Sequence, residues 1–406
     1  MGVVGTPTHA WAARETGTWP AWVYTAGLAL ALIFPSVGMV LTGGVQLTLL
    51  YVAAATGWVA VYSLAIAPAL LPRLSRGVAL AAGLAILGVL AVAIAVVHPA
   101  IDTAGFSIAG FKVGATDLDN AVDLGAQALL RGSNPYLERT FTGLPLAPLP
   151  GSFLLGLPFH LLGNVAFATI LFLAVFWVLG ARRSLQSSTL LLVLTITAGP
   201  AVVYEALTGM DYTTDVLAVL GLGALTLRVR DRTDLLVLSS AATGVAMATR
   251  INLALLAVPL LMVLLRGSGW QRAAIAGISI AAGFLLVSVP FYVWDPAAFF
   301  PLQGGADKIT GLPFSRVLIP AAGVMTAAGL ALLLPHRGAL DYFRDAFWMQ
   351  IVVIALTIGM QYAIGNPVAS NFFTYGTLAL YPGALFFWGR LFPGGFIHGH
   401  IPRAAA

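Results

Sequence analysis

Long apolar runs, repeated along nearly the whole chain, are the feature that most limits what this sequence can fold into. About 20 consecutive apolar residues cross the hydrocarbon core of a bilayer as a helix. Hydrophobic residues make up 59% of the 406 residues and charged residues only 9%, whereas soluble domains average roughly 25% charged residues. The sequence therefore predicts an all-α polytopic membrane protein with a single transmembrane domain over residues 1–406.

Twelve apolar runs are candidate spans, so we expect about 12 transmembrane helices. They cover residues 21–43, 45–70, 77–98, 164–181, 188–206, 213–228, 233–249, 252–265, 273–293, 314–335, 345–363 and 372–390. A further run, 149–162, is about fourteen residues long and contains Pro158. This length predicts a re-entrant or interfacial helix rather than a full span.

The basic residues sort to one side of the membrane when the N-terminus is placed in the cytoplasm. Of the 20 Lys and Arg residues, 14 then fall inside and 6 outside, as the positive-inside rule requires. We therefore expect a multi-pass plasma-membrane protein with both termini in the cytoplasm and its active site on the outer face. This topology also explains the net charge of +5 without any role for nucleic acid.

The longest outer segment, 99–163, carries the acidic stretch "ATDLDNAVDLGAQALLRGSNPY". Its spacing predicts a short amphipathic juxtamembrane helix over 118–130, with Asp117 as the N-cap and carboxylates facing water or a cavity. Gly132 is expected to end this helix, and "SNPY" to form a turn. The acids either cap and solubilise the helix, or one of them is a general base for an acceptor hydroxyl.

The residues from Asp119 to Tyr136 resemble the first outer-loop signature of the GT-C glycosyltransferases. The match is closest to family 87, the mannosyltransferases that depend on polyprenyl-phosphate mannose. It is carried by the following residues: Asp119 thirteen positions before Gly132, then Ala126, Ala128 and Leu130, and finally Asn134-Pro135-Tyr136.

This resemblance implies transfer of a sugar, mannose in that family, with inversion at the anomeric carbon. The donor would be a polyprenyl-phosphate sugar, and the acceptor a glycolipid or glycan on the outer face. It implies that Asp119 is the catalytic base and that Asn134 and Tyr136 shape the sugar or acceptor pocket. Asp117, two residues earlier, remains the alternative base.

Several other polar residues interrupt apolar surroundings and are candidate substrate contacts. Arg250 is suited to hold the donor phosphate because arginine binds phosphate bidentately; a snorkelling arginine at a hairpin tip is the alternative. Asp211 and Tyr212 lie between two spans, either in a solvated tip or facing the cavity. The remaining candidates are Arg131, His160 and Lys308.

We expect no metal and no other cofactor, because arginine can neutralise a monophosphate leaving group. The chain also lacks cysteine, which excludes thiolate metal sites and disulfides. The alternative function is a membrane transporter or lipid flippase for a glycolipid or small polar solute. Such proteins place ionisable residues and broken helices at the bilayer midplane.

Overall fold

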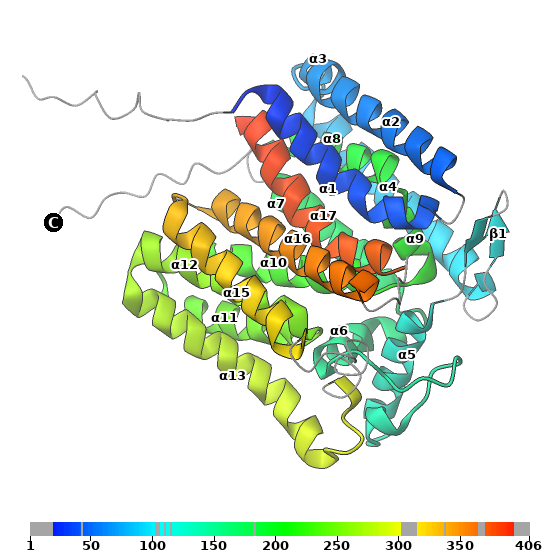
Figure 1. Cartoon of the computed structure of the whole chain (residues 1–406), viewed down its shortest axis with the longest axis vertical. Coiled ribbons are helices and arrows are strands. Elements are labelled where there is room, and N and C mark those ends of the chain that lie inside the picture. Colours follow the sequence, from blue (N-terminus) through cyan, green and yellow to red (C-terminus); the bar gives the residue numbers. More distant parts are fainter. Residues whose placement is uncertain are drawn as a thin grey trace, which may run out of the picture.

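The computed structural model describes residues 19–41, 44–101, 106–108, 111–113, 116–181, 184–301, 315–336, 338–363 and 370–393. These residues form a bundle of helices with one short antiparallel hairpin, β1 (Phe106–Ile108) and β2 (Phe111–Val113) (Figure 1). The first half contains α1 (Ala21–Leu41), α2 (Val45–Val61), η1 (Tyr62–Ile66), α3 (Ala67–Leu70), α4 (Arg76–Ile101), α5 (Asp117–Leu130), η2 (Pro135–Leu137), α6 (Pro150–Leu161), α7 (Phe167–Ala181), α8 (Leu185–Ala198) and α9 (Pro200–Thr208). The second half contains α10 (Tyr212–Arg228), α11 (Thr233–Met247), η3 (Ile251–Leu256), α12 (Ala257–Ser268), α13 (Trp270–Trp294), α15 (Ser315–Leu333), α16 (Ala339–Ala363) and α17 (Ser370–Leu391).

Within the described residues, each apolar run predicted as a span is mostly helical, but these residues do not establish 12 spans. Six helical segments are long and apolar enough to cross a membrane, and a seventh is added if α8 and α9 form one bent span. The helices α7 and α11 have 15 residues each and are too short to count among these candidate spans. The fold is therefore a helical membrane protein with six or seven clear candidate spans.

The run 149–162 forms α6, a helix of 12 residues that begins at Pro150. Its length is about 18 Å at 1.5 Å per residue, well short of the ~30 Å hydrocarbon core. Proline is favoured at this first helical position because its missing N–H would be unpaired there in any case. The helix cannot cross a bilayer alone, in agreement with the length argument made from the sequence.

The helix α13 has the features of a full span. It contains 25 residues, which corresponds to about 37 Å. A tryptophan lies at each end, and both are exposed: Trp270 by 69% and Trp294 by 51%. Tryptophan favours the two interfaces of a bilayer because its ring is apolar and its N–H can reach water.

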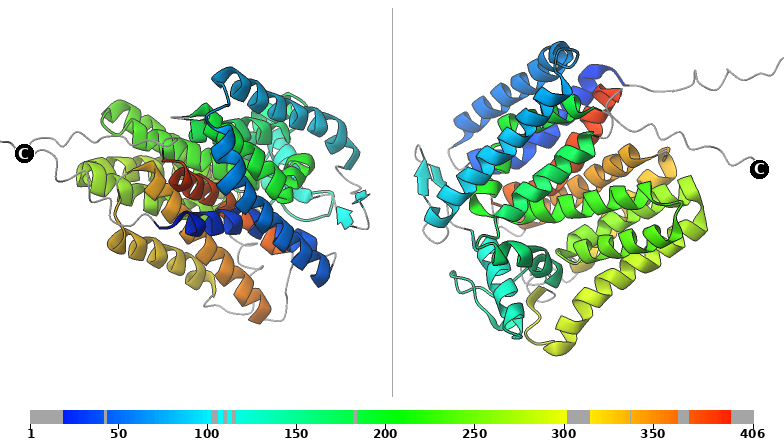
Figure 2. Two further views of the ribbon diagram at one scale, coloured as in Figure 1. Left: turned by 90° about the horizontal axis from the view of Figure 1, so that it is seen from above. Right: turned by 180° about the vertical axis from the view of Figure 1, so that it is seen from behind.

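The main core lies where α1, α7, α8, α10, α16 and α17 meet, and it is filled by large buried side chains such as Phe176, Tyr342, Tyr381 and Trp388. The helix α1 packs against α17, and α17 against α16. Seen from behind in Figure 2, α5 and α6 form a separate pair at one end of the bundle, beside the end of α13. The outer segment is thus attached to the bundle through its own small core.

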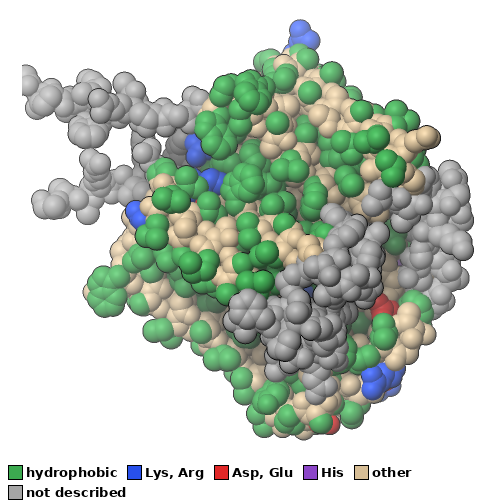
Figure 3. All heavy atoms as spheres, in the orientation of Figure 1, with side chains coloured by type: hydrophobic (Ala, Val, Ile, Leu, Met, Phe, Trp, Pro, Cys, Tyr) green, Lys and Arg blue, Asp and Glu red, His purple; other side chains and the backbone are tan. Residues whose placement is uncertain are grey.

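The charged side chains visible in Figure 3 lie toward the edges of the molecule in this view. The surface is dominated by hydrophobic side chains, with Lys and Arg toward the top, the left and the lower right, and Asp or Glu toward the lower right and the bottom. Two arginine-rich turns meet at one end, where Arg272 donates to Thr233 Oγ1 and to the carbonyl of Asp231. A girdle of apolar surface between charged ends is what a bilayer requires.

The broken segment α8–α9 bends by 83° between Ala198 and Pro200. Proline has no N–H to continue the helical ladder, so the bend leaves backbone groups without helical partners. Neighbouring helices supply those partners: Tyr51 donates to the Ala198 carbonyl at 2.9 Å, and the Ala201 N–H donates to Ser36 at 3.1 Å. The break is therefore stabilised by the bundle, and it turns α9 toward the candidate site.

Glycine allows α11 and α13 to cross closely. A Cβ added at Gly244 would overlap the Ile280 carbonyl, and one added at Gly283 would overlap the Ala241 carbonyl. Small residues at such crossings let two backbones approach, which gains van der Waals contact in a membrane protein.

Replacing Gly283 with valine should lower the free energy of unfolding by about 1–3 kcal/mol, because the two backbones must separate to admit the side chain. Thermal unfolding in detergent measures this. Gly88→Val is the matched control, since Gly88 in α4 is exposed and a Cβ there meets nothing within 4 Å. Equal melting temperatures for the two variants would contradict the close crossing.

Candidate functional site

The acidic helix predicted in the outer segment is present as α5. Thr116 rather than Asp117 precedes its first turn, and the Thr116 hydroxyl donates to Asp119 Oδ1 at 3.1 Å. Asp117 and Asp119 both lie in the first turn, where carboxylates stabilise the positive end of the helix dipole. Gly132 follows the helix with a positive φ of 68°, and η2 forms the expected turn. The N-cap prediction was wrong by one residue, and the helix prediction is confirmed.

Asp119 points into the protein rather than into water. It is 2% exposed, and its Oδ2 lies 3.0 Å from Nε2 of His98, which is itself buried near the end of α4. Hydrogen bonds of this kind offset the cost of burying a carboxylate. Asp119 is therefore held at the junction between the last turn of a candidate span and the outer segment.

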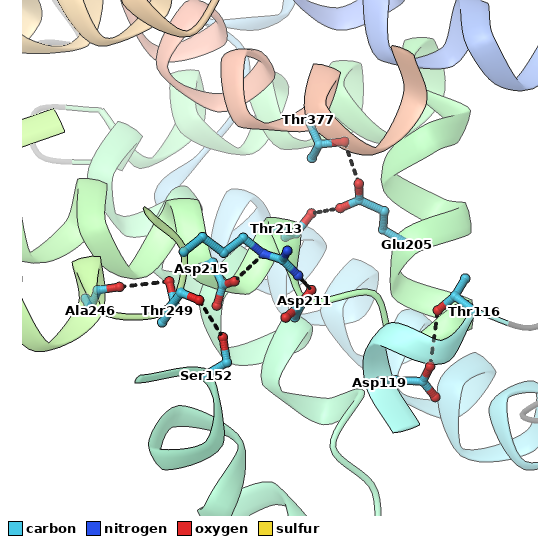
Figure 4. Close-up of polar contacts among 11 residues, drawn as sticks. Thr116, Asp119, Ser152, Glu205, Asp211, Thr213, Asp215, Ala246, Thr249 and Thr377 are labelled. Atoms are coloured by element: carbon cyan, nitrogen blue, oxygen red, sulfur yellow. Dashed lines mark hydrogen bonds and ion pairs between the residues drawn. The ribbon is translucent and has the colours of Figure 1, made fainter. Parts of the chain in front are cut away.

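The turn between α9 and α10 packs directly against Asp119 and His98. Gly209 has a positive φ of 71°, and a Cβ there would lie 2.7 Å from His98 Nε2 and 2.9 Å from Asp119 Cβ. Glycine is required on both counts, because other residues rarely adopt this φ and a side chain has no room. Figure 4 shows Asp119, Glu205 and Asp211 around this turn. Asp211 follows Gly209 by two residues, so the turn links Asp119 directly to a second polar cluster.

That second cluster is an ion-paired group of Asp211, Asp215 and Arg250. Arg250 Nε donates to Asp215 Oδ2 at 2.9 Å, and its Nη2 donates to Asp211 Oδ1. The guanidinium also lies over the ring of Tyr212, 3.9 Å from its centroid, in the geometry of a cation–π contact. All three charged side chains are nearly buried, with Arg250 at 12% exposure, Asp211 at 8% and Asp215 at 1%.

The loop before η3 that presents Arg250 is anchored from the outer segment. The Leu149 N–H donates to the Thr249 carbonyl at 3.0 Å, and Ser152 Oγ of α6 donates to the same oxygen at 3.2 Å. Gly151 lies so close to Ala248 that a Cβ would overlap its backbone. The helix α6 thus packs against this loop and fixes the position of Arg250.

Glu205 of α9 is fully buried between α10 and α17. Its carboxyl oxygens accept hydrogen bonds from Thr213, at 2.6 Å, and from Thr377. Thr213 in turn lies 2.9 Å from the Tyr381 hydroxyl. An ionisable group at such depth is costly and has its partners supplied by the bundle.

The other acids of the segment have separate partners. Asp117, the alternative base, accepts from Thr142 at 3.0 Å and from Thr140 at 3.4 Å. His160 of α6 bonds Asp123 Oδ1 through Nδ1 at 2.6 Å, with 19% and 42% of their side chains exposed. The exposed Arg131 pairs with the half-buried Glu138 at 2.8 Å. The structure therefore separates these residues from the Asp119–His98 pair.

Asn134 and Tyr136 lie in the small core of the outer segment. The Tyr136 N–H donates to Asn134 Oδ1 at 3.0 Å, and the Tyr136 hydroxyl donates to the Pro148 carbonyl at 3.0 Å. The ring is 2% exposed and packs against Phe153, Phe299 and Phe291, and this burial raises the pKa of Tyr136. These contacts position the loop, and a direct role in a sugar or acceptor pocket stays a prediction.

Two predicted features have no geometry to test them. Lys308 lies outside the described residues. Within the described ranges, no three His, Asp or Glu side chains are grouped in a way that could hold a metal ion. The expectation that no metal is needed remains an expectation.

Three residues of the site are not among the candidates predicted from the sequence: His98, Gly209 and Asp215. His98 lies beside Pro99 at the end of an apolar run. Asp215 lies one helical turn after Asp211, a spacing that brings two side chains to one face. An ionisable residue inside an apolar run was the available signal in each charged case.

Comparisons of the whole chain with protein-family models, with curated proteins and with solved structures found no match.

Replacing Gly209 with alanine should destabilise the protein through both backbone strain and crowding of His98 and Asp119. We expect a loss in the free energy of unfolding that exceeds that of Gly132→Ala by about 1–3 kcal/mol. Gly132→Ala is the matched control because its φ is also positive, at 68°, but a Cβ there meets nothing within 4 Å. Thermal unfolding of both variants provides the comparison, and equal losses would rule out crowding at Gly209.

Proposed function

We propose that this protein is an integral membrane glycosyltransferase that uses a lipid-phosphate sugar donor. The observation that carries the proposal is the α9–α10 turn: its Gly209 lies against a buried carboxylate, Asp119, and its Asp211 pairs with a buried guanidinium, Arg250. A base for an acceptor hydroxyl and a cation for a leaving phosphate are the two groups that this reaction needs.

In the proposed reaction, Asp119 accepts the proton of an acceptor hydroxyl while that oxygen attacks the anomeric carbon. A new glycosidic C–O bond forms, and the C–O bond to the donor phosphate breaks with its electron pair. The configuration at the anomeric carbon inverts because attack and departure occur on opposite faces. His98 and Thr116 support this role by orienting the Asp119 carboxylate.

Arg250 is proposed to hold the phosphate of a polyprenyl-phosphate sugar, with mannose as the sugar that the sequence resemblance favours. Its position is fixed by Asp211, Asp215 and Tyr212, which supports a precise rather than a diffuse binding site. Asp211 and Tyr212 themselves are proposed contacts of the sugar. The acceptor is proposed to be a glycolipid or glycan.

We place this reaction at the outer face of the plasma membrane, with both termini in the cytoplasm. Support comes from the segregation of charge in the bundle: α10 runs from Asp211 to the turn of Arg228–Arg232, and α13 runs from Arg272 to Asp295. Arginine-rich turns at one end favour the cytoplasm for that end.

A transporter or flippase is the second candidate, and one observation favours it. The bent segment α8–α9 carries the fully buried Glu205, and broken helices with ionisable residues are typical of transport sites. Against this, Asp119 and His98 lie at the end of α4, next to the outer segment, rather than along a path through the bundle.

Replacing Asp119 with asparagine should reduce the sugar-transfer rate by ~10²–10⁴, the usual contribution of a general base. The assay follows labelled mannose from polyprenyl-phosphate mannose into lipid extracts in proteoliposomes. Glu138→Gln removes a half-buried carboxylate of the same segment that lies apart from the Asp119–His98 pair, so it is the control and should keep full activity.

Two outcomes would contradict the assignment. Wild-type rates for Asp119→Asn with loss of activity in Asp117→Asn would make Asp117 the base. Accumulation of the intact labelled donor inside the vesicles, with no labelled product, would identify a transporter instead.

A further inference from the structure

In the cluster of Asp211, Asp215 and Arg250, one guanidinium bonds to two different carboxyl groups. The Nε–H and the adjacent Nη2–H of a guanidinium form one fork, which ordinarily receives the two oxygens of a single carboxylate. Here the two donors of that fork bond to two different carboxylates, Asp215 through Oδ2 and Asp211 through Oδ1. Two carboxyl groups therefore lie side by side along one edge of one cation.

The charges of this cluster do not balance if both carboxyl groups are ionised. One guanidinium between two carboxylates leaves one negative charge in excess. Asp215 is 1% exposed and Arg250 12%, so solvent screens the excess charge poorly. The effective cost of burying an uncompensated ion is several kcal/mol, and two nearby carboxylates that share one guanidinium disfavour each other's ionised form.

The second oxygen of Asp211 gives an independent sign of the same problem. Asp211 Oδ2 is buried and has no hydrogen-bond partner within the part of the chain that the structure describes, whereas the Thr249 side chain interacts with Asp215. A buried carboxylate oxygen without a donor is costly. A proton on the pair removes the excess charge, which lowers this cost.

The other titratable groups that face the cluster add no positive charge. Tyr212 lies beneath the guanidinium, and Tyr375 of α17 packs against Tyr212 with ring centroids 5.7 Å apart. Glu205 of α9 is close enough to interact with Asp211 through its charge. None of these neighbours is a base, so the described side chains that face the cluster supply no second cation to balance two ionised carboxylates.

We propose that Asp211 and Asp215 share one proton at neutral pH, which makes the Asp211–Arg250–Asp215 cluster a proton-binding site of zero net charge. Asp215 is its more buried member, and the proton is assigned to the pair because both carboxyl groups bond to the same guanidinium. This site stands independently of sugar transfer. If Arg250 also binds a donor phosphate, the proton keeps the site from repelling that anion.

Infrared spectroscopy of the purified protein in lipid nanodiscs tests the proposal, because a protonated carboxyl group has a C=O band that a carboxylate lacks. The experiment uses a Glu205→Gln background, since Glu205 is fully buried and would contribute its own band. We expect one carboxyl band at neutral pH in this background, and its loss when Asp215→Asn is added. Absence of the band in the background, or its persistence in both Asp215→Asn and Asp211→Asn, would overturn the proposal.

A second measurement covers the case in which the double variants fold poorly. Raising the pH from about 7 to about 9.5 should remove the shared proton and destabilise the wild-type protein by the buried excess charge. Asp215→Asn carries no such proton, so its melting temperature should fall less, by a difference of at least about 2 °C. Parallel pH dependence of the two proteins would show that the wild-type pair holds no proton.

Discussion

A polar group inside an apolar bundle must find its partner in the protein, because neither lipid nor packed side chains can supply one. In this chain that constraint is met around one turn, where Gly209 lies against the Asp119–His98 pair and Asp211 begins the cluster with Arg250. The position of the turn depends on the break between α8 and α9. Tyr51 and Ser36 stabilise that break through the backbone of Ala198 and Ala201.

The outer segment is attached to the same centre through two kinds of contact. Its aromatic core, around Tyr136 and Phe153, binds the end of α13 through Phe291 and Phe299. Its polar contacts, from Leu149 and Ser152 to Thr249, fix the loop that presents Arg250. A shift of α5 or α6 would therefore move the candidate base and the candidate phosphate ligand together, and this coupling suits a site assembled from distant parts of the chain.

Local pattern was a good guide where local physics decides the outcome. The helix α5 could be predicted because alternating apolar and acidic positions, an early carboxylate and a final glycine act within fourteen residues. The short helix α6 could be predicted because length alone limits what crosses a bilayer. The sequence left open whether the carboxylates of α5 face water or a cavity, and it could not show that Asp119 is buried, since Gly209, which packs against it, is 90 residues away.

The sequence by itself determined that this protein is a helical membrane protein, where its apolar helices lie, and that acids gather at one end, because hydropathy and charge act on each segment separately. Only the tertiary structure decided which polar partner each acidic side chain has. His98 with Asp119, Arg250 with both Asp211 and Asp215, and Glu205 with Thr213 and Thr377 are pairings between different helices. Such pairings follow from how the helices pack. The break between α8 and α9 and the turn at Gly209 place the Asp119–His98 pair beside the turn that carries Asp211.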